Sequence, residues 1–357
     1  MAGRGLILAA PASGSGKTTV TLGLLRALRD RGVAVRGAKS GPDYIDPRFH
    51  EAACGRACMT LDAFAMSPAR IRALAAGDGL LLIEGAMGLF DGAPPDGRGA
   101  TADLARILGL PVVLVVDAGR MAQSVAPLVA GFAAHDPEVR VAGVILNRVG
   151  SPRHAAMLAR ALAPLGLPVL GVVPRVAGLA HPSRHLGLVQ ARERPDLEQY
   201  MKDAAELIGQ ECDLAALEAL AAPLPPRPDA PRVPPPAASI AIASDAAFSF
   251  AYPHLLDDWE AAGARVTRFS PLADEAPPEA ELVYLPGGYP ELHAETIASA
   301  GNFVQGMKLT AQRASIYGEC GGYMVLGEHL TDADGTRHPM LGLLPLATSF
   351  ASRKLHL

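Results

Sequence analysis

The sequence predicts an α/β protein of two domains, the first built on a doubly wound parallel sheet and the second a smaller α/β unit after a proline-rich linker. Short aliphatic segments alternate with helical stretches on both sides of that linker, and segments such as LLLI and VVLVV are apolar throughout. Such strands are typical of a parallel sheet that helices cover on both faces. A length of 357 residues suits two domains.

The domain boundary is expected in the stretch PLPPRPDAPRVPPP, which holds eight prolines between Pro223 and Pro236. Proline interrupts helices and favours a stiff, extended chain. We therefore expect a first domain over 1–222, a linker over 223–237 and a second domain over 238–357. The expected strands are 5–9, 33–38, 80–84, 112–116, 141–147 and 168–173 in the first domain, and 239–244, 264–270, 282–286 and 314–319 in the second.

Composition argues against several functional classes. The 32 basic and 36 acidic residues give a net charge of -4, which offers no overall attraction to nucleic acid or to an anionic membrane. No apolar run reaches the length of a membrane-spanning helix, and the first apolar segment is too short for a signal peptide, so we expect a cytoplasmic protein. The four cysteines form no CxxC pair and no zinc pattern.

A phosphate-binding loop follows the first strand. The segment APASGSGKTT runs from a strand into a helix, which is the context that a P-loop requires. The backbone amides should surround phosphates, Lys17 should reach the β- and γ-phosphates, and Thr18 should bind Mg²⁺. The motif therefore predicts binding of ATP or GTP, although Pro11 replaces the first glycine of the usual pattern. The expected nucleotide-binding residues are Ser13, Gly14, Ser15, Gly16, Lys17, Thr18 and Thr19.

Acidic residues follow the second and third strands, at the sheet edge where open α/β folds bind ligands. In KSGPDYIDP, Asp43 and Asp46 stand beside prolines, which predicts a rigid loop, whereas Glu84 ends the third strand and Asp91 follows it. Magnesium takes one or two carboxylates beside phosphates and water, so we assign it Asp43 and Glu84 together with Thr18. The alternative is that both aspartates cap turns and that Glu84 is an ordinary acid at a strand end.

Further polar residues lie at the same edge. Lys39, Tyr44, Asp46 and Asp91 are candidates for contacting the substrate, with a solvated cation as the alternative for Lys39. Asn147, at the end of the fifth strand, is a candidate for reading the nucleotide base. A hydrogen-bonded loop residue is the alternative for Asn147.

One cysteine in the second half has the surroundings of a nucleophile. In YGECGGYM a strand runs into Cys320 and then into a helix, with small residues at the turn. A helix N-terminus lowers the pKa of a thiol and supplies amide donors. The segment LPGGYP ends another strand, so Gly287 and Gly288, together with Gly321, are candidates for an oxyanion hole. The other three cysteines suit buried apolar positions.

A catalytic cysteine normally works with a histidine base. His329 is expected on the helix that follows Cys320, whereas His338 and His356 lie in the closing residues. None of these histidines stands in a recognisable base motif.

Taken together, the motifs resemble those of the cobyrinic and hydrogenobyrinic acid a,c-diamide synthases. The resemblance rests on APASGSGKTT, KSGPDYIDPRFH, EGAMGLFDG, SRHLGL, LPGGYPELHA and YGECGGYM, which follow the family's order over 6–324. It implies a dethiobiotin-synthetase-like nucleotide domain and a class I glutamine amidotransferase domain of the triad type. Members carry a further C-terminal segment with the histidine that partners the cysteine. The resemblance thus implies a shortened second domain whose histidine lies beyond Leu357.

The resemblance also implies a reaction: ATP- and glutamine-dependent amidation of the a- and c-acetate carboxylates of (hydrogeno)cobyrinic acid through acyl phosphates. Its partners are a corrin polycarboxylate and glutamine, its cofactors ATP and Mg²⁺, and a homodimer stays open. The alternatives are cobyric acid synthase-type amidation of other corrin carboxylates and a P-loop switch ATPase, although Ala12 stands where such switches carry a lysine. The catalytic residues would be Cys320, Lys17, Asp43, Asp46 and Glu84.

Overall fold

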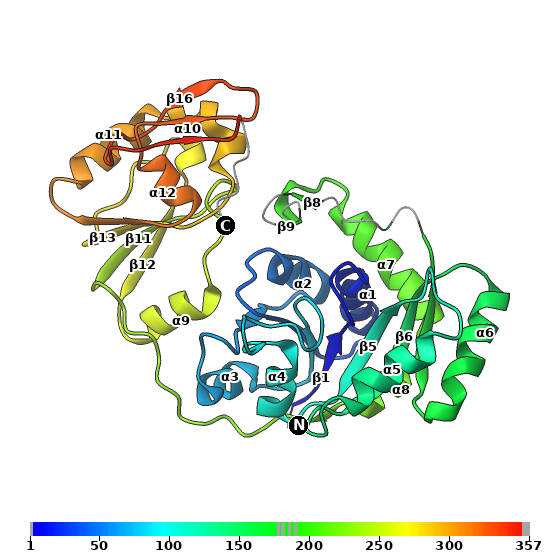
Figure 1. The fold of residues 1–357 in the computed structure, drawn as a ribbon. Helices are drawn as coiled ribbons and strands as arrows, with labels where there is room; N and C mark the ends of the chain where they lie inside the picture. The colour runs from blue at the N-terminus through cyan, green and yellow to red at the C-terminus, as the bar shows by residue number, and fades with distance from the viewer. Residues whose placement is uncertain (1–2, 177–178, 180–182, 185–186, 189–190, 352–357) are drawn as a thin grey trace. The chain divides into compact units, whose positions relative to one another are not determined.

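The chain divides into two units, Met1–Pro231 and Arg232–Leu357, each with its own parallel sheet (Figure 1). The structure is a computed structural model that describes residues 3–176, 179, 183–184, 187–188 and 191–351. Within these residues no helix is both long and apolar enough to cross a membrane.

The sheet of the first unit has the strand order β3-β2-β4-β1-β5-β6-β7, all parallel, and β10 joins β1 in the antiparallel direction. The order reverses at β1, so the loop after β1 lies at the switch point where open α/β sheets bind ligands. The strands are β1 (Arg4–Ala9), β2 (Val35–Ser40), β3 (Met59–Leu61), β4 (Leu80–Glu84), β5 (Val112–Asp117), β6 (Val141–Val149), β7 (Val169–Pro174) and β10 (Ala222–Pro223).

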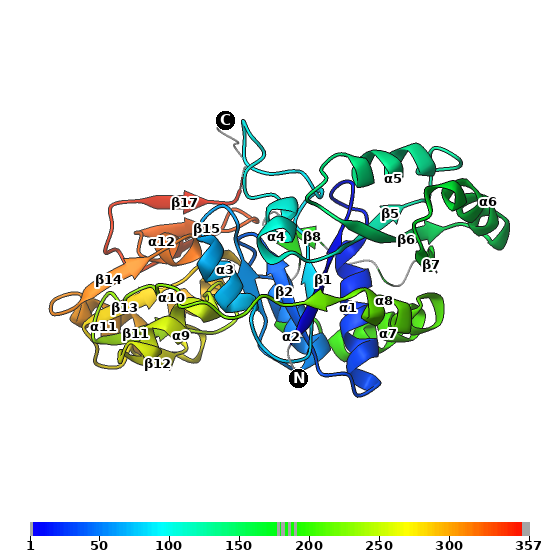
Figure 2. The same ribbon diagram turned by 90° about the horizontal axis from the view of Figure 1, so that it is seen from below.

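Helices cover both faces of this sheet (Figure 2). One face carries α1 (Lys17–Asp30), α2 (Asp46–Cys54) and α7 (Leu197–Glu211), with α8 (Leu214–Leu220) beside them. The other face carries α3 (Pro68–Ala75), α4 (Thr101–Leu108), α5 (Val125–Ala134) and α6 (Pro152–Leu162). Two short 3₁₀ turns, Ala163–Leu165 and Ala191–Glu193, also belong to this unit.

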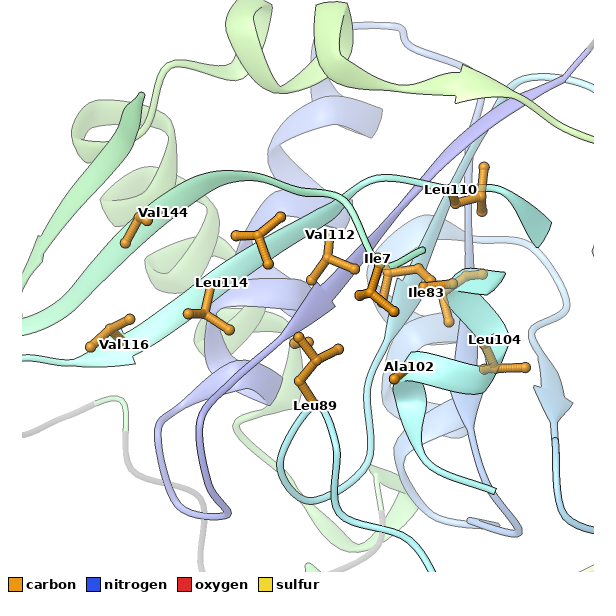
Figure 3. Close-up of a cluster of buried hydrophobic side chains, with 14 of the residues drawn as sticks. Ile7, Ile83, Leu89, Ala102, Leu104, Leu110, Val112, Leu114, Val116 and Val144 are labelled. Carbon is orange, nitrogen blue, oxygen red and sulfur yellow. The ribbon is translucent and has the colours of Figure 1, made fainter. Parts of the chain in front are cut away.

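The core on the α3–α6 face consists of aliphatic side chains from the central strands (Figure 3). Ile7, Ile83 and Leu114 come from β1, β4 and β5 and belong to one cluster with Leu104 of α4, and all four are fully buried. Burying each such side chain contributes roughly 1.5–3 kcal/mol. This packing fixes the strands whose ends carry the acidic residues.

The structure corrects the sequence-based expectations at the edge of this sheet. The residue Asp46 was expected in a rigid loop but begins α2, because Pro47 lies in the first turn, where its missing amide is not needed. β2 continues to Ser40, so Lys39 belongs to the sheet. β3 was not predicted. In the motif SRHLGL, residues 185–186 lie outside the described residues, and its other residues form β8 (Ser183–Arg184) and β9 (Gly187–Leu188).

The second unit has a parallel sheet with the order β12-β11-β13-β14, close to the expected strands, and a small sheet with the order β16-β15-β17. His329 was expected on a helix, but that helix ends at Val325 and His329 begins a strand. The strands are β11 (Ser239–Ala243), β12 (Arg265–Phe269), β13 (Leu282–Leu285), β14 (Ser315–Gly318), β15 (His329–Thr331), β16 (Arg337–Pro339) and β17 (Ala347–Ser349). The helices are α9 (Pro253–Ala261), α10 (Ala294–Ser299), α11 (Gly301–Thr310) and α12 (Gly321–Val325), with 3₁₀ turns at Pro271–Ala273 and Pro290–His293.

Candidate active site

The P-loop connects β1 to α1 and can be formed only with glycine at two positions. Gly14 and Gly16 have left-handed backbones, with φ of 77° and 87°. A Cβ at Gly16 would also lie 2.2 Å from Nδ2 of Asn147. Because α1 begins at Lys17, its first amides have no helical acceptor and are available to an anion.

The buried side chain of Asn147 supports this loop. Its Nδ2 donates to the carbonyl of Ser15 at 2.8 Å, and its Oδ1 accepts from the amide of Arg148 at 2.9 Å. These two bonds agree with the alternative that Asn147 is a hydrogen-bonded loop residue. Its contact with a nucleotide base stays a prediction.

Glu84 is the centre of a buried network at the end of β4. Parallel pairing of β2 with β4 sets Lys39 opposite Glu84, and Lys39 Nζ donates to Glu84 Oε1 at 2.9 Å. Thr18 Oγ1 of the P-loop donates to the same oxygen at 2.6 Å, and Nε2 of His50 lies 2.7 Å from Oε2. Lys39 Nζ also donates to Asp46 Oδ2 at 2.5 Å. These bonds link the P-loop to the start of α2.

Burial and charge act in opposite directions on the pKa values of this network. Burial raises the pKa of Glu84, but Lys39 and His50 outweigh it and hold that pKa below its usual range. Burial lowers the pKa of Lys39, but Asp46 and Glu84 outweigh it and raise that pKa above the usual range. For Asp46, burial and the charge of Glu84 raise the pKa to about 6 in spite of Lys39. The network thus holds a charged Lys39–Glu84 pair out of water.

The loops around the network show which of the alternatives apply. Lys39 is not a solvated cation, because it is 5% exposed and paired with two acids. Asp43 does cap a turn, since its Oδ1 accepts from the amides of Ile45 and Asp46 at 2.8 and 3.0 Å. Tyr44 is half-buried beside it.

The loop after β4 meets the P-loop. Lys17 Nζ donates to the carbonyl of Met87 at 2.6 Å, and the amide of Leu89 donates to the carbonyl of Ala10 at 2.8 Å. Met87 is held with a positive φ of 47°, an unfavourable backbone for a residue other than glycine. Asp91 accepts from the amide of Gly88 at 2.9 Å and so closes the turn. Burial lowers the pKa of Lys17.

The oxygen donors near the phosphate loop fit magnesium. Thr18 offers a hydroxyl, and Oδ2 of Asp43 accepts no hydrogen bond from any described residue. Both oxygens of Glu84 take part in hydrogen bonds, one of them with the Thr18 hydroxyl, and the binding of magnesium by Glu84 stays a prediction. Nowhere in the described ranges do three His, Cys, Asp or Glu side chains gather to hold a metal alone. Phosphate oxygens and water would have to complete the coordination, as magnesium usually requires.

Cys320 stands at a sharp turn between β14 and α12, exposed to solvent. Its φ of 50° lies in the left-handed region, which a residue other than glycine rarely adopts. The loop after β13 lies against it, because a Cβ at Gly287 would be 3.0 Å from the Cβ of Cys320. A Cβ at Gly321 would be 2.6 Å from Cδ of Pro290. Strain and close packing therefore present this thiol beside the glycine-rich loop at Gly287 and Gly288.

His329 and His338, two histidines that follow Cys320, are hydrogen-bonded to other side chains. Nε2 of His338 lies 2.8 Å from Oδ2 of Asp332, and Nδ1 of His329 accepts from the guanidinium of Arg337 at 2.8 Å. No hydrogen bond joins a histidine to Cys320 in the part of the chain that the structure describes, and His356 lies outside it.

Comparisons with known proteins match both units. The CobQ/CobB/MinD/ParA nucleotide binding domain matches residues 6–189, and the CobB/CobQ-like glutamine amidotransferase domain matches residues 239–356. Hydrogenobyrinate a,c-diamide synthase of Rhizobium meliloti is 57% identical over 99% of this chain and 83% of that protein. The proteins of that name from Brucella anthropi and Rhodobacter capsulatus are 56% and 54% identical over the same shares. The chain belongs to the hydrogenobyrinate a,c-diamide synthase family.

Among solved structures, the septum site-determining protein MinD of Pyrococcus horikoshii, complexed with Mg-ADP, is 19% identical to this chain. It matches over 57% of this chain and 95% of its own, with a TM-score of 0.35.

His50 belongs to the Glu84 network, and it was not predicted from the sequence. It lies four residues after Asp46 on α2, so both side chains are on one face of the helix and reach the Glu84 network. The spacing of four residues between Asp46 and His50 could have indicated this pairing, but only if a helix was expected to begin at Asp46. The two flanking prolines pointed to a loop instead.

Replacing Glu84 with glutamine should destabilise the first unit. Glu84→Gln keeps the shape but leaves Lys39 with one fewer buried counter-charge, so the free energy of unfolding should fall by about 3–5 kcal/mol. Urea unfolding followed by far-UV circular dichroism measures this, with the exposed Glu206→Gln as the control. A loss no larger than that of the control would contradict the network.

The exposure of Cys320 makes a second prediction. The other three cysteines are buried, so brief treatment of the native protein with iodoacetamide should alkylate Cys320 alone, as peptide mass mapping will show. Gly287→Ala should slow this reaction several-fold, because the added methyl group meets the cysteine. Gly301→Ala is the matched control, since a Cβ there contacts nothing within 4 Å. Equal rates in both variants would show that the loop does not press on the thiol.

Proposed function

We propose that this chain is an ATP- and glutamine-dependent hydrogenobyrinate a,c-diamide synthase that amidates the two acetate carboxylates of the corrin ring. The observation that carries the proposal is the hydrogen-bonded path from Thr18 through Glu84 and Lys39 to Asp46, which joins the phosphate loop to an acidic site. Identity of 57% to a relative of that name supports the substrate. Residues 1–222 form the synthetase domain, 223–237 the linker and 238–357 the amidotransferase domain of a cytoplasmic enzyme.

In the synthetase reaction, a carboxylate oxygen of the corrin attacks the γ-phosphorus of ATP, and ADP leaves. Ammonia then attacks the carbonyl carbon of the acyl phosphate and loses a proton, and inorganic phosphate leaves with the original carboxylate oxygen. Lys17 and the P-loop amides stabilise the charge on the transferring phosphoryl group. Glu84 fixes Thr18, and Lys39 with Asp46 borders the acceptor.

Magnesium, when bound, would neutralise phosphate charge during this transfer. Thr18, Asp43 and Glu84 are the residues that would hold it, and Glu84 also accepts a hydrogen bond from the Thr18 hydroxyl. Tyr44, Asp46 and Asp91 remain available to contact the corrin.

In the amidotransferase reaction, the thiolate of Cys320 attacks the amide carbon of glutamine. The amide nitrogen takes up the proton that the thiol lost and leaves as ammonia, and a thioester remains. Water then hydrolyses the thioester to glutamate and restores the thiol. The amides of Gly287, Gly288 and Gly321 are the donors for the oxyanion of the intermediate.

Two substitutions separate these reactions when ammonia is the nitrogen source. Lys17→Ala should abolish ammonia-dependent amidation, because the carboxylate is no longer activated, whereas Cys320→Ser should leave the rate unchanged. Mass spectrometry of the corrin product, with hydrogenobyrinate, ATP and magnesium present, measures both rates.

The product pattern also tests the function itself. Addition of two amides to the acetate carboxylates supports the proposal. Amidation of other carboxylates would indicate the cobyric acid synthase-type reaction, and ATP hydrolysis without amidation would indicate a switch ATPase. Amidation retained in Lys17→Ala would remove the P-loop from the mechanism.

A further inference from the structure

A cavity borders the P-loop, and neither Lys17 nor Glu84 belongs to its lining. It has a volume of about 860 Å³ and lies at the carboxyl ends of β5, β6 and β7. Residues 11–15 of the P-loop form one wall. A ligand in this cavity would therefore touch the loop that holds the nucleotide phosphates.

The lining of the cavity includes three arginines and one acidic residue, Asp117. Arg148 forms an ion pair with Asp117 at 2.5 Å, whereas Arg120 and Arg175 make no ion pair or hydrogen bond through their side chains with any residue that the structure describes. The cavity thus carries a surplus of two positive charges in a protein whose net charge is -4. This surplus favours a ligand with several negative groups.

The backbone holds these arginines in place. Arg148 has a positive φ of 59°, and its amide donates to Oδ1 of Asn147 at 2.9 Å. The amide of Arg175 donates to the carbonyl of Val149 at 3.2 Å, and a Cβ at Gly119 would lie 2.5 Å from the Arg175 guanidinium. The absence of a side chain at position 119 therefore leaves room for that guanidinium.

The cavity also has an apolar lining. Met121 from the loop before α5, and Leu128 and Phe132 from α5 itself, contribute to it. Phe132 stacks on Phe90 with ring centroids 5.7 Å apart, which fixes its position. A lining that combines apolar side chains with unbalanced positive charge fits a large apolar ring that carries carboxylates on its periphery.

The nucleotide explains this cavity less well. Its phosphates are expected at the first amides of α1, and neither Lys17, Thr18 nor Glu84 lines the cavity. A nucleotide base is uncharged, so it offers no ion-pair partner to Arg120 and Arg175. The surplus charge therefore favours the carboxylate-bearing substrate.

We propose that this cavity binds the corrin polycarboxylate, and that Arg120 and Arg175 hold peripheral carboxylates that are not being amidated. Guanidinium groups bind carboxylates through two parallel hydrogen bonds, so they would fix the ring and select which carboxylate reaches the phosphoryl group. This inference rests on the proposed function.

The test compares Arg120→Ala, Arg175→Ala and Arg175→Lys with Arg160→Ala, which changes an exposed arginine of α6 outside the cavity. Hydrogenobyrinate binding is measured by absorbance titration, and KM for hydrogenobyrinate and for ATP by ammonia-dependent assays. Each alanine variant of the cavity should weaken hydrogenobyrinate binding and raise its KM about 10-fold or more, with KM for ATP within about 2-fold of wild type. Arg175→Lys should bind hydrogenobyrinate more weakly than wild type but more tightly than Arg175→Ala, because it keeps the charge and loses the paired hydrogen bonds.

An increase in KM for ATP alone would assign the cavity to the nucleotide, and unchanged binding in both alanine variants would leave the arginines without this role. Either result overturns the proposal. Circular dichroism confirms that each variant is folded. If the wild-type protein amidates no corrin, the proposed function fails, and the titration still decides separately whether the cavity binds hydrogenobyrinate.

Discussion

The buried ion pair between Lys39 and Glu84 is the constraint on which the rest of the first unit's site depends. Parallel register between β2 and β4 places both groups side by side and out of water. A charge in that position is stable only when its partners are complete. Those partners come from two helices. Thr18 lies at the start of α1, whereas Asp46 and His50 lie on successive turns of α2.

Because the buried pair needs all of these partners, the P-loop and the acidic residues are held in one hydrogen-bonded network. Glu84 orients the hydroxyl of Thr18, and Asp46 is fixed at the start of α2. On the other side of the P-loop, the arginines at the ends of β5 to β7 provide charge of the opposite sign. The phosphate loop thus lies between an acidic network suited to phosphoryl transfer and a basic cavity suited to a polycarboxylate.

Local patterns in the sequence were sufficient to predict the P-loop, both parallel sheets and the turn at Cys320, because each depends on short spacings of glycine and aliphatic residues. The start of α2 was missed because proline can begin a helix as well as oppose one. The burial of Lys39 depends on the pairing of β2 with β4 beyond residue 38, where the predicted strand ended. The grouping of Arg120 with Arg175 depends on the order of the strands in the sheet. Neither can be obtained from neighbouring residues alone.

The most direct test of the account is the fate of the carboxylate oxygen. Hydrogenobyrinate labelled with ¹⁸O in its acetate carboxylates is incubated with the protein, ATP, magnesium and ammonia, and the mass of the inorganic phosphate is measured. Activation as an acyl phosphate predicts one ¹⁸O atom in phosphate for each amide formed. Unlabelled phosphate at a normal yield of amide would contradict the mechanism.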